Sequence, residues 1–185
     1  MGHGGDVIDE LTTDHREVAD FFGQFHQTPP GSHDRKRLLD QLTVELVRHS
    51  VAEEQHLYPA VREHLPNGGK IADKELADHA QVEQMLKELE GMEPRDPAFD
   101  PAVRALQREV IAHIHDEEST LFVRMRRDCG EDVLWDLGER VRTAKKTSPT
   151  RPHPRMPSTP PANRLVDPGM GMVDRARDLL TGRGR

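Results

Sequence analysis

The sequence predicts an all-α protein, an up-down-up-down antiparallel four-helix bundle followed by a proline-rich, basic C-terminal tail. Three observations support this fold class. Apolar residues recur at steps of three and four along four segments of similar length, and no segment has the apolar-polar alternation of a half-buried strand. Aromatic residues make up only 4% of the chain. Short connections between the segments make neighbouring helices antiparallel.

The first helix is expected from about Asp6 to Gln27. Its apolar stripe keeps an alternation of three and four residues and includes one histidine: Ile8, Leu11, His15, Val18, Phe22 and Phe25. Residues 29–31, Pro-Pro-Gly, end the helix. A single histidine in such a stripe is more often a hydrogen-bonded core residue than a ligand. His15 is therefore a candidate ligand only because other helices also contribute core-facing histidines.

The second helix is expected from about Ser32, an N-cap residue, to His64, with Pro59 bending or breaking it. Its stripe begins with leucines and continues into ionisable residues at the same steps: Leu39, Leu42, Leu46, His49, Glu53 and His56. In a helical bundle these steps face the core. The ionisable residues therefore occupy positions where the pattern requires leucine.

The third helix is expected from about Ala72 to Glu90 and the fourth from about Pro101 to Arg127. Both stripes again contain ionisable residues: His79 with Glu83 four residues on, and His113 with Glu117. After a break at residue 130, the apolar spacing predicts a short further helix over residues 133–141. Each helix of the predicted bundle thus contributes a core-facing histidine.

The character of the chain changes from Lys145 onward. Seven prolines lie between residues 149 and 168, and they indicate an extended linker. We therefore expect two parts, a bundle over residues 1–145 and a flexible tail over residues 146–185, with two turns of basic amphipathic helix over Met172 to Leu180. The favoured role of the tail is to solubilise the protein; docking onto the bundle, a weak partner or an anionic membrane are alternatives.

The charge is unevenly distributed along the chain. The formal net charge is -7, and residues 142–185 contain ten basic and three acidic residues, which leaves 16 basic and 30 acidic residues in the body. The body thus carries a net charge of -14. An acidic body argues against nucleic acid as the main partner, and the partner of the tail is not specified by its composition.

The cysteine content and the N-terminal residues indicate in which cellular compartment the protein is expected. Cys129 is the one cysteine, so no intrachain disulfide can form and a thiolate metal site is disfavoured. The N-terminal residues lack the basic and apolar stretches of a signal peptide, and no segment has the length and apolarity of a transmembrane helix. We therefore expect a soluble, cytoplasmic protein.

A repeated motif joins these residues into one candidate site. His49-x-x-x-Glu53-Glu54-x-x-Leu57-Tyr58 recurs as His113-x-x-x-Glu117-Glu118-x-x-Leu121-Phe122. Residues four apart on a helix share a face, so each copy directs an imidazole and a carboxylate toward the core. Several unpaired buried carboxylates would cost more than the roughly 5 to 15 kcal/mol by which a domain is stable. A network of protonated histidines and glutamates is one solution, and bound metal is the favoured one.

The donor types favour borderline metal ions such as iron, manganese, zinc or copper. Four imidazoles and two carboxylates are too many for one tetrahedral ion, but they suit two octahedral ions bridged by the carboxylates. In order and spacing these motifs resemble the hemerythrin-like family, the HHE cation-binding domain, over about residues 6–127. The resemblance implies a centre of two non-haem iron ions, oxo- or hydroxo-bridged, with these ligands: His15, His49, His79 and His113 as terminal groups and Glu53 and Glu117 as bridges.

The sequence departs from hemerythrin at two positions. Hemerythrin has a second histidine four residues after the ligand of the third helix, where this chain has Glu83. Its last carboxylate ligand lies five residues after the histidine of the fourth helix, which is the spacing of Glu118 from His113. If Glu83 or solvent replaces that histidine, the site becomes more anionic or gains an open position. Either change favours Fe(III) and exchange with water. We therefore expect a small diatomic or peroxide ligand, with peroxide decomposition, nitric oxide chemistry or iron and oxygen sensing at least as favoured as reversible oxygen carriage.

Two alternatives to a redox-active di-iron protein remain. A ferritin-like enzyme or iron store needs two Glu-x-x-His motifs, and only Glu53-x-x-His56 fits, so it is disfavoured. The other alternative is a metal-stabilised or zinc-bound helical interaction module without redox turnover.

Several neighbouring residues are expected to play lesser parts. Glu54 and Glu118 are expected in solvent or in contact with the ligands, and His56 in a hydrogen bond rather than on the metal. Tyr58 could approach the metals, but it is rotated off the stripe, so packing in the core is the favoured expectation. His115 points away from His113 and is expected to be exposed.

Overall fold

The computed structural model describes residues 4–154, 156, 158–159 and 162–181, and over these residues it contains helices and no strand. The all-α prediction is therefore confirmed. The helices are α1 (Val7–Gln27), α2 (His33–Ala52), α3 (Tyr58–His64), α4 (Gly68–Glu90), α5 (Phe99–Asp116), α6 (Phe122–Asp128), α7 (Glu131–Thr147) and α8 (Ala162–Thr181), with two π-helical turns, η1 (Glu53–Leu57) and η2 (Glu117–Leu121).

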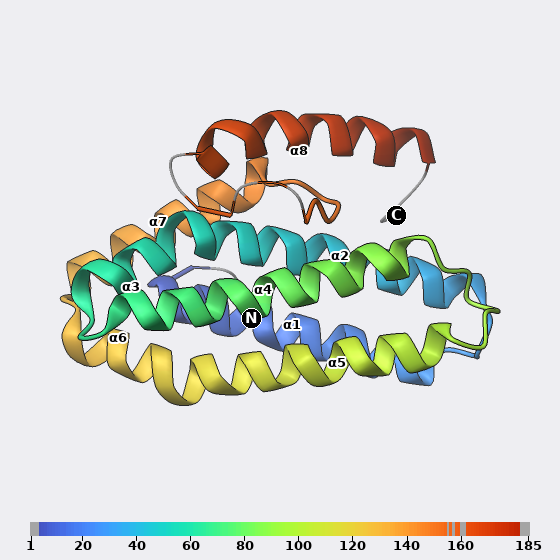
Figure 1. Cartoon of the computed structure of the whole chain (residues 1–185), viewed down its shortest axis with the longest axis horizontal. Helices are drawn as coiled ribbons and strands as arrows, with labels where there is room; N and C mark the ends of the chain where they lie inside the picture. The colour runs from blue at the N-terminus through green and yellow to red at the C-terminus, as the bar shows by residue number, and fades with distance from the viewer. Residues whose placement is uncertain (1–3, 155, 157, 160–161, 182–185) are drawn as a thin grey trace.

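Figure 1 shows α1, the α2–α3 pair, α4 and the α5–α6 pair lying side by side along the long axis. The connection from α3 to α4 is tight because Asn67 has a positive φ of 60° and Gly68 lies against the backbone of Val61. A Cβ atom at Gly68 would lie 2.0 Å from the Val61 carbonyl oxygen, so only glycine fits there. None of the described helices is both long enough and apolar enough to cross a membrane.

The core is divided into two apolar clusters. One cluster joins the start of α1 to α3, α6 and α7: Leu11, Leu57, Val61, Met125 and Val141 are among its buried residues. The other joins the end of α1 to α2, α4 and α5: Phe22, Leu39, Leu86, Phe99 and Leu106 are among its buried residues. On each helix the core-facing ionisable residues lie between the segments that form the two clusters. A polar band therefore interrupts the apolar core.

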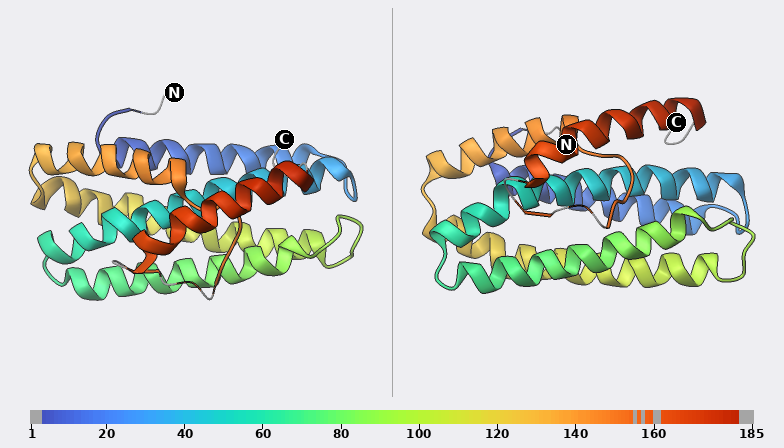
Figure 2. Two further views of the ribbon diagram at one scale, coloured as in Figure 1. Left: turned by 90° about the horizontal axis from the view of Figure 1, so that it is seen from above. Right: turned by 45° about the horizontal axis from the view of Figure 1, so that its top comes forward.

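The last two helices differ from the sequence-based expectation. α7 begins directly after Gly130, packs on α1 and α2, and is longer than the short helix expected over residues 133–141. α8 extends over twenty residues rather than two turns, and it continues through Pro168, so the expectation of irregular structure at that proline is wrong. Figure 2 shows α8 crossing over the bundle. Whether residues 146–185 form a separate flexible part stays a prediction.

Candidate metal centre

The six predicted ligands lie together in the polar band. They fall into overlapping groups in which one ligand atom of each residue lies within 4.8 Å of the others: His15, His49, Glu53 and Glu117; Glu53, His79 and His113; Glu75, His113 and Glu117. The side chains of Glu53 and Glu117 are completely buried. The arrangement therefore has two pairs of histidines and two glutamates shared between them.

Each shared glutamate lies between histidines of different pairs. An oxygen of Glu53 is 3.2 Å from His49 Nε2 and 3.3 Å from His79 Nε2. An oxygen of Glu117 is 3.3 Å from His15 Nε2 and 3.5 Å from His113 Nε2. The ring centroids within each histidine pair are 5.0 Å apart for His15 and His49 and 4.9 Å apart for His79 and His113. Groups of imidazole and carboxylate atoms at this spacing could hold metal ions.

The outer nitrogen of each histidine contacts a carboxylate. The Nδ1 atoms pair as follows: His15 with Glu118 at 2.9 Å, His49 with Asp14 at 3.1 Å, His79 with Glu54 at 3.1 Å and His113 with Glu75 at 3.2 Å. A carboxylate at Nδ1 fixes the proton there and directs the Nε2 lone pair inward, as metal-binding histidines require.

Two of these four carboxylates were not identified from the sequence. Glu54 and Glu118 were expected in this role or in solvent, whereas Asp14 and Glu75 were missed. Asp14 precedes His15 in the sequence but contacts His49 of another helix, so spacing along one helix could not assign it. The sequence signal available for Glu75, which is buried on α4, was its spacing four residues before His79, on the same face of the helix.

Tyr58 is buried in the first apolar cluster, as expected, and its hydroxyl group also reaches the ligands. The Tyr58 hydroxyl lies within the band, 3.3 Å from Glu53, 3.2 Å from Glu117 and 2.9 Å from His79 Nε2. In the π-helical turn η1 the backbone N–H of Tyr58 donates to Glu53, five residues earlier, which brings these two side chains onto one face. The π-helical turn adds one residue to the spacing of an α-helix, and this extra residue explains why the hydroxyl reaches the glutamates although the α-helical projection places Tyr58 off the stripe.

The second copy of the motif forms the same turn, η2. The backbone N–H of Phe122 donates to Glu117, and the Phe122 ring stacks on His15 with centroids 5.7 Å apart. Position 123 is valine, where the first copy has Pro59, so a proline is not required for the π-helical turn. The two turns begin at the two shared glutamates, which is consistent with the frequent occurrence of such turns at functional sites.

The electrostatics of the band without metal are those of buried ion pairs. Burial alone would lower the pKa of His49, but the charge of Glu53 and the hydrogen bond to Asp14 raise it well above its ordinary value. His79 is affected in the same way: burial lowers its pKa, yet Glu53 and Glu54 raise it to about 10. Burial would raise the pKa of Glu53, but the neighbouring histidines hold it well below the usual range.

The donor atoms of the band fit bound cations. Among the described residues, Glu53 Oε1 is buried without a hydrogen-bond partner, and Glu117 Oε2 and His15 Nε2, 3.3 Å apart, form an ion-pair contact but no hydrogen bond. Such atoms are costly to bury unless a ligand satisfies them. The set is neutral imidazole and carboxylate without thiolate, which suits iron, manganese or zinc. The residues therefore fit a pair of such ions.

Other histidines and acids lie outside the three groups. Glu83 accepts a hydrogen bond from the backbone N–H of His153 at 2.7 Å, and burial, together with nearby Glu54, raises its pKa. It thus faces the segment after α7 rather than the shared glutamates. His56 is half-buried and belongs to none of the groups, and His115 is exposed, as expected.

Replacing Tyr58 by phenylalanine is expected to destabilise the metal-free protein. The hydroxyl is the buried hydrogen-bond donor to the shared glutamates, and burial and these charges raise its pKa well above the ordinary value, so it keeps its proton. Its loss should lower the free energy of unfolding by about 1–3 kcal/mol. Urea unfolding followed by circular dichroism measures this difference. Equal stability of the two proteins would show that the hydroxyl does not hold the carboxylates.

Comparison with known proteins agrees with this geometry. Residues 6–125 match the family model described as the hemerythrin HHE cation binding domain. A hemerythrin-like protein of Schizosaccharomyces pombe is 27% identical over 94% of this chain and 86% of its own length. A DNA nickase of Nostoc is 29% identical over 75% of this chain, which spans only 39% of the nickase.

The fold has a solved counterpart. The crystal structure of a hemerythrin HHE cation binding domain-containing protein from Mycobacterium kansasii superposes with a TM-score of 0.68 at 22% identity. The match covers 77% of this chain and 86% of that protein. At this identity the likeness concerns the fold.

Proposed function

Since the chain belongs to the hemerythrin HHE cation-binding domain family, we propose that its polar band binds two non-haem iron ions and that the loaded protein binds or reduces dioxygen, peroxide or nitric oxide. The biological outcome would be oxygen, redox or iron sensing, or detoxification. The observation that supports this proposal is the pair of buried glutamates, each set between histidines of two different pairs.

The ligands divide between two ion positions. His15 and His49 would hold one ion, His79 and His113 the other, and Glu53 and Glu117 would be shared. The carboxylates at the outer Nδ1 atoms would keep each imidazole in the tautomer that binds metal. Bound iron would supply the open coordination position and the electrons for a small diatomic or peroxide ligand.

The surrounding helices determine the environment of the proposed centre. We infer that α1, α2–α3, α4 and α5–α6 form an up-down-up-down antiparallel bundle, because α1 contacts α2, α3 contacts α4, and α4 contacts α5. Apolar clusters on both sides of the band would exclude bulk water and large substrates. No nucleic-acid partner is proposed, because the body is acidic and the chain spans a minor part of the nickase it resembles.

Metal analysis of anaerobically purified protein tests the proposal. We expect about two iron ions per chain, and absorption bands of oxo-to-iron charge transfer after exposure to dioxygen or peroxide. Colourless protein without iron, purified from iron-fed cells, would contradict it and favour the metal-stabilised interaction module. A reduced protein that forms a long-lived oxygen adduct without peroxide turnover would instead indicate oxygen carriage.

His113→Ala is expected to lose iron and thermal stability together. His113 contacts Glu75 through its outer nitrogen and lies 3.5 Å from Glu117 through its inner nitrogen, so the variant removes a ligand and one partner of each of these buried carboxylates. His115→Ala is the matched control, because His115 is two residues away and exposed. Iron content and melting temperature are measured for both, and equal values for the two variants would contradict the assignment of His113.

A further inference from the structure

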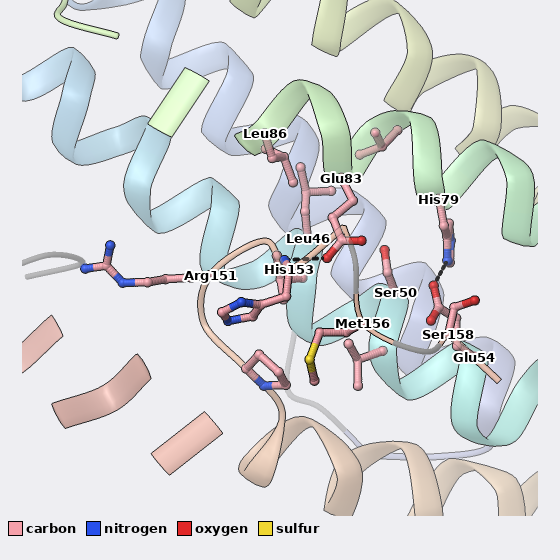
Figure 3. A pocket seen from close by; sticks show the side chains of 14 residues that line it. Leu46, Ser50, Glu54, His79, Glu83, Leu86, Arg151, His153, Met156 and Ser158 are labelled. Atoms are coloured by element: carbon pink, nitrogen blue, oxygen red, sulfur yellow. Dashed lines mark hydrogen bonds and ion pairs between the residues drawn. The ribbon is translucent and has the colours of Figure 1, made fainter. Parts of the chain in front are cut away.

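A small chamber lies between α2, α4 and the segment that follows α7. α2 and η1 contribute Leu46, Val47, Ser50, Val51 and Glu54 to its wall, and α4 contributes His79, Val82, Glu83 and Leu86. The roof is formed by Pro149, Arg151, His153, Met156 and Ser158, which we call the strap (Figure 3). The cavity volume is about 40 Å³, enough for one to a few molecules of the size of water.

The strap is fastened to both α8 and α4. Asp174, almost completely buried on α8, accepts from the backbone N–H groups of Thr150 and Arg151, each at 3.1 Å, and contacts His153 Nε2 at 2.9 Å. The Arg151 guanidinium contacts Asp178 at 2.7 Å. It also contacts Glu90 of α4 at 2.9 Å. These contacts hold the strap against α8 and α4 in this structure.

α8 can approach the end of α7 because residue 171 is glycine. A Cβ atom there would lie 2.2 Å from the carbonyl oxygen of Thr147 and 2.8 Å from that of Ser148. The same end of α7 receives a hydrogen bond at 3.2 Å from Arg175 to the Ser148 carbonyl. These contacts place Asp174 and Asp178 where they can hold the strap.

The inner end of the chamber reaches the metal centre. His79 lines the chamber, and its Nδ1 contacts Glu54, another lining residue, at 3.1 Å (Figure 3). The opposite nitrogen of His79 lies 3.3 Å from the shared Glu53. One imidazole thus separates the chamber from the proposed ion positions.

A second hollow reaches the band from the other side, between α4 and α5. It is lined by Lys74, Asp78, Gln81, Val82, Glu109, Ala112 and His113. Five of its seven lining residues are charged or polar, whereas seven of the fourteen residues that line the chamber are apolar. Small uncharged molecules enter apolar cavities more readily than charged, hydrated surfaces. The carboxylates of Glu54 and Glu83 in the chamber would also disfavour anions.

We propose that the chamber under the strap is the binding and entry site for the small uncharged ligand of the centre, of the size of dioxygen, nitric oxide or hydrogen peroxide. This inference rests on the proposed function. The strap excludes larger molecules because Arg151 ties it to α4 and α8. The C-terminal segment thereby limits the size of the substrate.

The test uses the full chain with two readouts. Ser50→Phe fills the chamber from a half-buried position, and Gln81→Trp fills the opposite hollow as the matched control. In the iron-loaded protein, Ser50→Phe should slow the reaction with hydrogen peroxide by about tenfold or more at unchanged iron content, and Gln81→Trp should not. In metal-free protein, dissolved xenon should shift the methyl resonances of Val47 and Val51, and Ser50→Phe should abolish these shifts.

A third variant, Arg151→Ala, keeps the test decisive if Ser50→Phe does not fold. It should speed the reaction with tert-butyl hydroperoxide relative to hydrogen peroxide, because the strap loses its contacts with Glu90 and Asp178 and no longer excludes the larger molecule. An unchanged ratio, an unaffected Ser50→Phe rate, or a slowed Gln81→Trp protein overturns the inference while the proposed function stands. If the chain binds no iron, the proposed function fails. In that case xenon shifts would still support the chamber as a binding site, and their absence would overturn this inference too.

Discussion

Glu117→Gln is expected to reduce the iron content from about two ions per chain to one or fewer. Glu117 is completely buried, and its carboxylate lies 3.3 Å from His15 and 3.5 Å from His113, which belong to different histidine pairs. Glutamine keeps the size and shape but is neutral, and its amide nitrogen cannot act as a bridging ligand. Iron analysis and the charge-transfer absorption of the purified variant measure the loss.

The adjacent residue provides the matched control. Glu118 is 41% exposed at its side chain and contacts the outer nitrogen of His15 at 2.9 Å, so it orients a ligand without being one. Glu118→Gln should keep both ions and weaken their binding by about 10–100-fold. Equal iron losses in the two variants would contradict the distinct roles of these neighbours. Full iron content in Glu117→Gln would show that the Glu117 carboxylate is not needed as a shared ligand.

Helical periodicity was sufficient to bring the six candidate ligands together. Apolar steps of three and four assign one face of a helix to the core, so His15, His49, His79 and His113 were each predicted to face inward before any contact was known. The i to i+4 spacing then placed Glu53 and Glu117 on the same faces. Each of these rules applies to a single helix. The ligands of different helices come together because the four apolar faces are buried in one core.

Contacts that depend on several helices could not be predicted in this way. Asp14 and Glu75 contact histidines of other helices, so their roles depend on how the helices are rotated and shifted against one another. Tyr58 enters the band because of a π-helical turn, which changes the spacing from four residues to five. The docking of the strap depends on Asp174 and Asp178, far along the chain, and proline content alone indicated an extended linker.

The charge balance of the band makes metal and protons competitors. Without metal, His79 has a pKa of about 10, because Glu53 and Glu54 outweigh the effect of burial. His49 is raised well above its ordinary pKa by Glu53 and Asp14 in the same way. Protons on these imidazoles therefore neutralise the buried glutamates. Metal requires the same nitrogens without their protons, so each ion bound must displace them.

The stability of the metal-free protein is expected to fall as the pH rises from about 6.5 to 10. A histidine whose pKa is raised on folding contributes stability that is complete below its unfolded pKa and is lost as the pH passes its folded pKa. For His79 this window runs from its ordinary value of 6.5 to about 10, and the loss by pH 9 is on the order of a few kcal/mol. Urea unfolding of metal-free protein at pH 6.5, 8 and 9 measures it.

The iron-loaded protein should not show this loss of stability over the same range. Deprotonation of the imidazoles strengthens metal binding, so the difference in unfolding free energy between loaded and metal-free protein should widen as the pH rises. His79→Gln is the informative variant, because removing this proton should flatten the metal-free slope by up to about 1.4 kcal/mol per pH unit. A metal-free protein that becomes more stable between pH 6.5 and 9 would show that protons do not occupy the place of the ions.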